Sequence, residues 1–254
     1  MCLILFAYRA HPAYKLVVAA NRDEFYDRPT APLHYWEDHP GVLAGRDLLK
    51  MGTWLGVSRT GRFAALTNYR NPKENTEGKR SRGELVADYL TDQTSPEQYM
   101  QAAASKRHFY PGYNLLAGDS KELYYYSNIE DRVRRLEPGI YGISNHLLNT
   151  DWPKVRQGRE GLARILGEER EGLTDRLFSF LQTADPAPDH LLPSTGVSLE
   201  WERRLSPMFI RSEAYGTRSS AVVLVTEENM MIRELVYTKE GINERKFDIA
   251  LQNR

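Results

Sequence analysis

The sequence has a single cysteine, no net charge and no long apolar run. One cysteine excludes an intramolecular disulfide, which suits a reducing compartment. The 34 basic and 34 acidic residues cancel, so the chain as a whole has no electrostatic attraction to nucleic acid or to an anionic membrane. No apolar stretch approaches the roughly 18–20 residues of a transmembrane helix. We therefore expect a globular protein with no nucleic-acid partner and no integral membrane segment.

Signals for secretion, metal binding and phosphate binding are also missing. The N-terminal apolar run is too short for a secretory signal and no basic segment precedes it, so we expect a cytoplasmic protein. The 6 histidines are scattered without ligand-type spacing, and no Gly-rich phosphate-binding motif is present, so we expect no metal and no cofactor. With 254 residues the chain can bury a substantial core, and we predict one domain over residues 1–254. The oligomeric state stays open.

The first 24 residues predict a β-hairpin that places the lone cysteine beside a polar cluster. Residues 2–8 and 14–20 are apolar runs separated by His11-Pro12-Ala13, which is the pattern of a strand, a turn and a returning strand. The second run ends abruptly in Asn21-Arg22-Asp23-Glu24. Antiparallel pairing of the two strands would bring these four polar side chains back beside Cys2.

Further hairpins and helices are predicted along the chain. Gly-containing turns between apolar runs predict hairpins over residues 54–68, 113–127, 133–144 and 218–237, with one more strand over 242–249. Helix-start signals and apolar stripes predict helices that begin at Ser81 (with Glu84 completing a capping box), at Ser95 and after Asp151, and helices over 173–181 and 200–205. The proline-rich segment 25–42 is predicted to be a loop. Strands and helices do not alternate regularly, which favours an α+β fold with largely antiparallel sheets, arranged as two sheets covered by helices.

Cys2 has two interpretations. A free cysteine on a strand is most often a small buried apolar residue. Its position, however, allows chemistry: removal of the initiator methionine would leave Cys2 with a thiol and a free α-amino group. That amine has an unperturbed pKa of about 7.7–8.0, so it can accept the proton of its own thiol near neutral pH.

The polar residues at strand ends also have two interpretations. As ordinary residues they would be solvated turns and surface ion pairs. In the catalytic interpretation Asp23 orients the α-amino group of Cys2, and Arg22 lowers the pKa of the thiol. Asn68 and Asn145, each at the end of a predicted strand, would donate to an oxyanion, and one such donor is worth about 10²–10³ in rate. Arg218 would add positive charge around the thiolate.

Several motifs together resemble one family. They are Met1-Cys2, Asn21-Arg22-Asp23-Glu24, Gly52-Thr53-Trp54-Leu55-Gly56, Ala65-Leu66-Thr67-Asn68-Tyr69, Ser81-Arg82-Gly83-Glu84-Leu85-Val86, Gly142-Ile143-Ser144-Asn145 and Tyr215-Gly216-Thr217-Arg218-Ser219-Ser220. In this order they resemble the NRDE family, whose best-known members are the transport and Golgi organisation protein 2 homologues. The resemblance covers essentially the whole chain.

The NRDE family is in turn similar to the N-terminal-nucleophile hydrolases, especially the choloylglycine hydrolase and penicillin V acylase branch. In that branch a strand after the N-terminal cysteine ends in Arg-Asn-x-Asp. The matching stretch here is Ala20-Asn21-Arg22-Asp23, in which Ala20 replaces the leading arginine. Asn68 and Asn145-His146 match the two asparagine contexts of the branch's oxyanion site. The resemblance implies a four-layer αββα sandwich with mostly antiparallel sheets.

Two functions of different classes follow. The first is an N-terminal cysteine hydrolase that cleaves an amide or thioester bond of a small or lipid-like acyl molecule. The second is a non-catalytic binding or trafficking protein on the same fold, with haem or an acyl lipid as ligand, because the resemblance implies roles in lipid homeostasis and haem trafficking. In either case Asn21, Trp54, His146 and Arg82 are the candidate substrate-binding residues. Arg82 belongs to the cluster Lys79-Arg80-Ser81-Arg82, which could hold propionates or phosphates.

Overall fold

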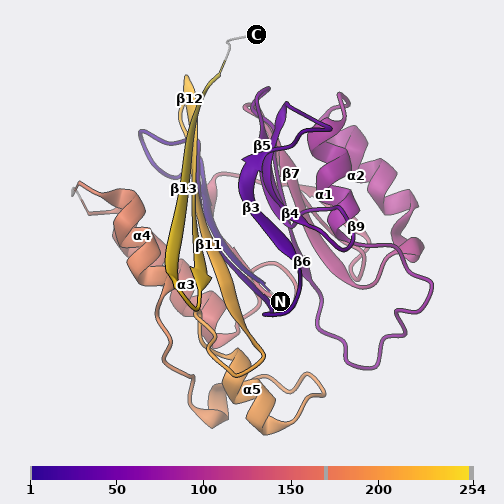
Figure 1. Cartoon of the computed structure of the whole chain (residues 1–254), viewed down its shortest axis with the longest axis vertical. Coiled ribbons are helices and arrows are strands. Elements are labelled where there is room, and N and C mark those ends of the chain that lie inside the picture. Colours follow the sequence, from indigo (N-terminus) through magenta and orange to yellow (C-terminus); the bar gives the residue numbers. More distant parts are fainter. Residues whose placement is uncertain (1, 169–170, 252–254) are drawn as a thin grey trace.

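The protein consists of two stacked β-sheets with helices on both outer faces (Figure 1). The computed structural model describes residues 2–168 and 171–251. The first sheet has the order β10-β1-β2-β11-β12-β13, with bounds Gly139–Ile143, Cys2–Tyr8, Leu16–Phe25, Tyr215–Val225, Asn229–Thr238 and Gly241–Ala250. The second runs in chain order from β3 to β9, with bounds Thr30–Tyr35, Val42–Asp47, Leu55–Ser58, Phe63–Asn68, Tyr113–Gly118, Leu123–Ser127 and Arg132–Arg135. The strand pairs in both sheets are antiparallel.

Two pairs of helices form the outer layers. Helices α3 and α4 (Pro153–Leu166 and Leu173–Leu181) cover the first sheet, and α1 and α2 (Gly83–Thr91 and Pro96–Ser105) cover the second (Figure 1). The short helix α5 (Leu199–Leu205) lies in the long connection before β11. The predicted α+β class and αββα layering are confirmed. Among the described residues, no helix has the length and apolar character needed to cross a membrane.

Side chains alternate between the two faces of each sheet, so the core has three layers, one between the sheets and one under each pair of helices. On β1, Ile4 and Phe6 face the second sheet, whereas Leu3 and Leu5 face α3 and α4. Every residue of β1 is buried because the strand pairs with β2 on one side and β10 on the other. This accounts for its uninterrupted apolar sequence.

The N-terminal hairpin is confirmed, and its register determines the site. Cys2 pairs with Arg22 and Leu3 with Asn21. Residues with even numbers on both strands face the space between the sheets, so the side chains of Cys2 and Arg22 lie next to each other on that face.

The structure corrects the predictions for two strand regions. The segment 25–42 contains β3, which tolerates Pro32 because it is the edge strand of its sheet and has a register shift between Ala31 and His34. The predicted hairpin over 133–144 is wrong, since β9 pairs with β8 in the second sheet and β10 pairs with β1 in the first. The chain therefore crosses from one sheet to the other between these two strands.

Helix starts were predicted with mixed success. The capping box at Ser95 is present, with reciprocal bonds to Gln98. The one predicted at Ser81 is wrong, because α1 starts after Arg82 and Glu84 pairs with Arg80 instead.

Candidate functional site

A cavity of about 430 Å³, which we call the Cys2 cavity, lies where the N-terminal hairpin meets the second sheet. It is bordered by the end of the hairpin, by the loops on either side of β4 and β5, and by the segment that leads into α1. Its charged lining residues include seven cations and four carboxylates: Arg22, Arg28, Arg46, Lys50, Lys79, Arg80, Arg82, Asp23, Glu24, Asp47 and Glu234. The interior of the Cys2 cavity is therefore cationic, although the chain as a whole is neutral.

The thiol of Cys2 borders this cavity and is only 7% exposed. Burial raises the pKa of the thiol, because the thiolate loses its hydration. The guanidinium of Arg22 and the main-chain N–H of Asp23 act in the opposite direction. On balance the resting thiol stays protonated, so a nucleophilic role would require a base.

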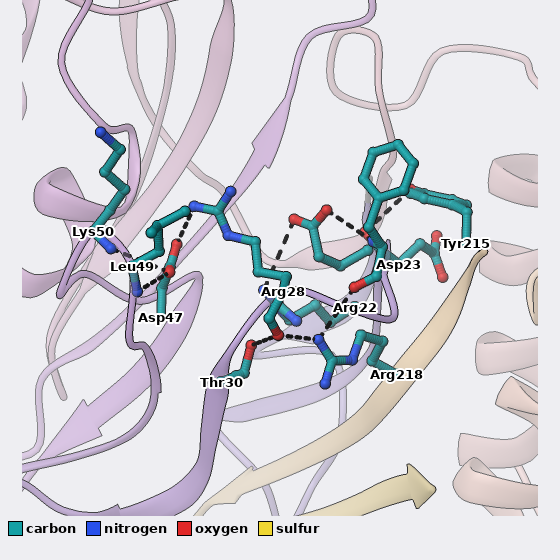
Figure 2. Close-up of polar contacts among 11 residues, drawn as sticks. Arg22, Asp23, Arg28, Thr30, Asp47, Leu49, Lys50, Tyr215 and Arg218 are labelled. Atoms are coloured by element: carbon teal, nitrogen blue, oxygen red, sulfur yellow. Dashed lines mark hydrogen bonds and ion pairs between the residues drawn. The ribbon is translucent and has the colours of Figure 1, made fainter. Parts of the chain in front are cut away.

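Asp23 is fixed by two residues of β11, one of the two strands next to β2. The hydroxyl of Thr217 donates to Asp23 Oδ1 at 2.6 Å. The hydroxyl of Tyr215 donates to the main-chain oxygen of Asp23 at 3.1 Å (Figure 2). Burial raises the pKa of the Asp23 carboxyl, while the ammonium of Lys154 opposes that shift. Its carboxylate is thus a rigid acceptor at the end of β2, next to the N-terminal strand.

Lys154 is a buried cation that the sequence did not reveal. It lies in the first turn of α3, is 3% exposed, and donates to the main-chain oxygen of Leu205 at 3.0 Å. Burial lowers its pKa to about 8, against the attraction of Asp23 and of Cys2. The sequence gives no signal for this, because a lysine at a helix start is normally solvated.

The two asparagines predicted as oxyanion donors, Asn68 and Asn145, lie next to each other, but Asn145 is not part of the cavity lining. Asn68 lines the cavity at the end of β6, and Asn145 Nδ2 donates to the main-chain oxygen of Asn68 at 3.0 Å. Next to it, the Ser144 hydroxyl donates to the main-chain oxygen of Cys2 at 3.0 Å. The loop after β10 therefore connects the strand that carries the thiol with the strand that carries Asn68.

Arg82 and Trp54 also line the Cys2 cavity. Arg82 donates to the main-chain oxygen of Gly112 at 3.0 Å. Burial lowers the pKa of its guanidinium, and the negative charges of Glu74 and of a Cys2 thiolate oppose that change. Arg82 is therefore close enough to Cys2 to interact with it electrostatically.

The structure does not bring Asn21 or His146 to the lining of the cavity. Asn21 faces α4, where its amide donates to the main-chain oxygens of Leu181 and Met208 at 2.9 and 2.8 Å. The ring of His146 lies 3.0 Å from the Tyr69 hydroxyl and 2.9 Å from the Thr150 hydroxyl. Burial lowers the pKa of His146. In the described structure both side chains hold neighbouring segments together.

Arg218 lies beside the Cys2 cavity rather than in it. It is the extra residue of a β-bulge, because Thr217 pairs with Asp23 and Ser219 pairs with Arg22. Its guanidinium donates to the main-chain oxygens of Phe25 and Arg28 (Figure 2). It thereby supports the loop after β2.

The loop after β2 places Arg28 in the lining of the Cys2 cavity. Arg28 donates to Asp47 at 2.6 Å, and Asp47 also accepts the main-chain N–H groups of Leu49 and Lys50 at 2.9 and 3.2 Å (Figure 2). This pair joins the loop after β2 to the end of β4. Among the described residues, no group of three or more His, Cys, Asp or Glu side chains is arranged to hold a metal ion.

Comparison with known proteins gives the family. The profile of the family described as Transport and Golgi organisation 2 matches residues 1–237. This chain belongs to that family. It is 37% identical over 245 residues to the Transport and Golgi organization protein 2 homolog of Bos taurus, covering 89% of this chain and 88% of the relative. It is 32% identical over 281 residues to the homolog of Homo sapiens, covering 100% of each chain.

A solved structure supports the fold. The Caenorhabditis elegans ortholog of N-acylethanolamine-hydrolyzing acid amidase superposes with a TM-score of 0.50 at 14% identity, covering 88% of this chain and 92% of that one. This chain thus has the N-terminal-nucleophile hydrolase fold, as predicted. The name of this neighbour describes an amide hydrolase, whereas the names of the two relatives refer to transport and Golgi organisation.

Proposed function

We propose that this protein is an N-terminal cysteine hydrolase that cleaves the amide or thioester bond of an acyl compound. The observation that carries the proposal is the register of the N-terminal hairpin, which places the Cys2 thiol on the wall of the Cys2 cavity beside Arg22. Asp23, Asn68 and Arg82 line the same cavity.

The first step is acylation. After removal of Met1, the α-amino group of Cys2 takes the thiol proton and the sulfur attacks the acyl carbonyl carbon. Asn68 donates to the oxyanion, Asn145 is the predicted second donor, and Asp23 orients the ammonium. The tetrahedral intermediate collapses with cleavage of the C–N or C–S bond, and the ammonium returns its proton to the departing amine or thiolate.

The second step restores the enzyme. Water attacks the acyl–Cys2 thioester and gives one proton to the α-amino group. The C–S bond breaks, the thiolate regains that proton, and the acid leaves. The balance is one acyl compound and one water consumed, and one carboxylic acid and one amine or thiol released. Arg22 and Arg82 contribute positive charge near the sulfur in both steps.

Intact-mass analysis tests this proposal. The native protein is measured alone and seconds after mixing with a panel of acyl thioesters and acyl amides. We expect a species without Met1 that gains one acyl group, mapped to Cys2, and no such adduct in the Cys2→Ala variant. Retention of Met1, or absence of any adduct on Cys2 with every compound, would refute the hydrolase.

A specific observation favours one alternative, a carrier of haem or an acyl lipid. Lys79, Arg80 and Arg82 all line the Cys2 cavity, where they would face propionates or phosphates. For haem, the described lining residues include no histidine, methionine or tyrosine, so Cys2 is the lining residue that would hold the iron.

Titration with haemin and with a long-chain acyl-coenzyme A tests the carrier. We expect saturable binding that weakens when the three cations are replaced by alanine. Equal affinity of the wild-type protein and this variant would show that Lys79, Arg80 and Arg82 do not bind the ligand. We further propose a cytoplasmic location, which fractionation of cells expressing the untagged chain checks.

A further inference from the structure

A second cavity lies beside the Cys2 cavity and shares a wall with it. We call it the side cavity; it has a volume of about 460 Å³ and lies between β3 of the second sheet and β11, β12 and β13 of the first. The two cavities have four lining residues in common: Arg22, Thr30, Ser219 and Glu234. A molecule that enters one is therefore separated from the other by a few side chains only.

The shared wall joins the two sheets. Glu234 on β12 is 6% exposed, and its Oε2 accepts the main-chain N–H of Leu33 on β3 at 2.7 Å. Burial raises the pKa of this carboxyl, against the positive charges of Arg22 and Arg245. Arg22, Ser219 and Glu234 in this wall are buried, and Thr30 is half-buried.

The strand register connects the thiol with the side cavity in one continuous row. Cys2 pairs with Arg22, Arg22 with Ser219, Ser219 with Val236, and Val236 with Asn243. Cross-strand partners project from the same face of a sheet, so all five side chains face the second sheet. Adjacent strands are about 4.8 Å apart, which puts Val236 about 14 Å from Cys2 along the row.

Along this row the lining changes from mainly charged side chains at Cys2 to a mixture of apolar and polar side chains in the side cavity. Beyond the wall, the apolar residues Ala31, Pro32 and Val236 line the side cavity, together with Thr238. The exposed polar residues Asn243, Glu244 and Arg245 line its far end, and the half-buried Arg218 also contributes to the lining. By contrast, the Cys2 cavity carries seven cations.

We propose that the side cavity holds the apolar acyl chain of the substrate, extended from Cys2 across Arg22 and Ser219 towards Val236. This rests on the proposed hydrolase function. The acyl group stays bonded to Cys2 when the leaving group departs, so the two parts need different sites. The polar leaving group occupies the cationic Cys2 cavity, which opens at the exposed residues Lys50 and Lys79.

The proposal predicts that the rate of Cys2 acylation depends on the length of the acyl chain. Each methylene moved from water to an apolar lining favours binding by about fourfold. With N-acetylcysteamine thioesters from acetyl to decanoyl, we expect the rate of Cys2 acylation to rise with each added methylene.

Val236→Trp is the decisive variant, because Val236 is half-buried and its side chain lines the side cavity. It should lower acylation by the octanoyl thioester at least about tenfold and change acylation by the acetyl thioester less than about twofold. Ile242→Trp is the matched control. Ile242 is 58% exposed and precedes Asn243, so its side chain lies on the opposite face of β13.

A binding measurement separates this proposal from the hydrolase. In the Cys2→Ala background, calorimetry with the octanoyl thioester should show saturable binding that Val236→Trp abolishes and Ile242→Trp retains. This result would support the side cavity even if no thioester acylates Cys2 in the wild-type protein. Equal loss of acetyl and octanoyl acylation in Val236→Trp, no dependence on chain length, or no octanoyl binding in the Cys2→Ala protein would overturn it.

Discussion

Replacing Glu202 by glutamine should destabilise the protein strongly, because it removes the charge partner of a buried arginine. Glu202 Oε2 lies 2.8 Å from Arg70 Nη1, and the two side chains are only 4% and 7% exposed. Burial lowers the pKa of Arg70, and Glu202 opposes this shift. The other carboxylate oxygen accepts the main-chain N–H and the hydroxyl of Thr195. Glutamine retains the shape but leaves Arg70 buried without a charged partner.

The magnitude follows from the burial of the pair. Leaving one charge of a buried pair uncompensated costs about 3–5 kcal/mol. At about 2–4 °C per kcal/mol for a chain of this size, Glu202→Gln should lower the Tm on the order of 10 °C. Glu200→Gln is the matched control on the same helix, because Glu200 pairs with Arg204 at the surface. Such exposed pairs are worth about 0–1 kcal/mol.

Differential scanning calorimetry of the two variants provides the stability assay, and acylation of Cys2 provides a second readout. The main-chain N–H of Arg70 donates to the main-chain oxygen of Asn145 at 2.7 Å, so displacement of Arg70 should also slow acylation. Similar Tm values for Glu202→Gln and Glu200→Gln would refute the reasoning. That result would mean that water or a rearranged side chain compensates the charge of Arg70 at little cost in stability.

Two further predictions concern buried polar groups. Lys154 has its pKa lowered from 10.5 to about 8 by burial, so between these pH values the unfolded chain binds a proton that the folded chain has lost, and this residue's contribution to stability rises with pH. We therefore expect the difference in unfolding free energy, wild type minus Lys154→Met, to increase by about 3 kcal/mol from pH 8 to pH 10.5. Urea denaturation of both proteins at several pH values measures this difference, and a difference that does not change with pH would contradict the prediction. Tyr125→Phe should cost about 1–3 kcal/mol, because its buried hydroxyl donates to Asn114 Oδ1 at 2.8 Å and accepts the Leu148 N–H at 3.1 Å. Tyr124→Phe, whose hydroxyl contacts only Glu122 in the described structure, should change stability by less than about 0.5 kcal/mol, and equal losses would refute the assignment.

The sequence predicted the parts of the fold that depend on neighbours in the chain. The hairpin that pairs Cys2 with Arg22 follows from two apolar runs and a short turn, and the capping box of Ser95 from a local spacing. Pairing between distant strands could not be predicted in this way. Residues 139–143 were assigned to a local hairpin, whereas their partner is β1, more than 130 residues earlier in the chain.

The same distinction applies to the candidate site. Asn68 was found because polar residues at strand ends stand out against apolar runs. Lys154 and Glu234 were missed because their burial depends on α3 and β3, which are brought in by tertiary packing. The side cavity was equally invisible, since it requires β3, a strand in a segment whose prolines predicted a loop.

The four residues Asn21-Arg22-Asp23-Glu24 illustrate why one strand end can serve both folding and chemistry. Because side chains alternate along β2, Asn21 faces α4 and Arg22 faces the Cys2 cavity. Asn21 donates to the last residue of α4 and to the connection before β11, and Asp23 accepts the Thr217 hydroxyl. A shift of one residue in this register would turn Arg22 towards the helices and remove its charge from Cys2. The structural bonds of Asn21 and Asp23 therefore maintain the register that the proposed chemistry of Cys2 requires.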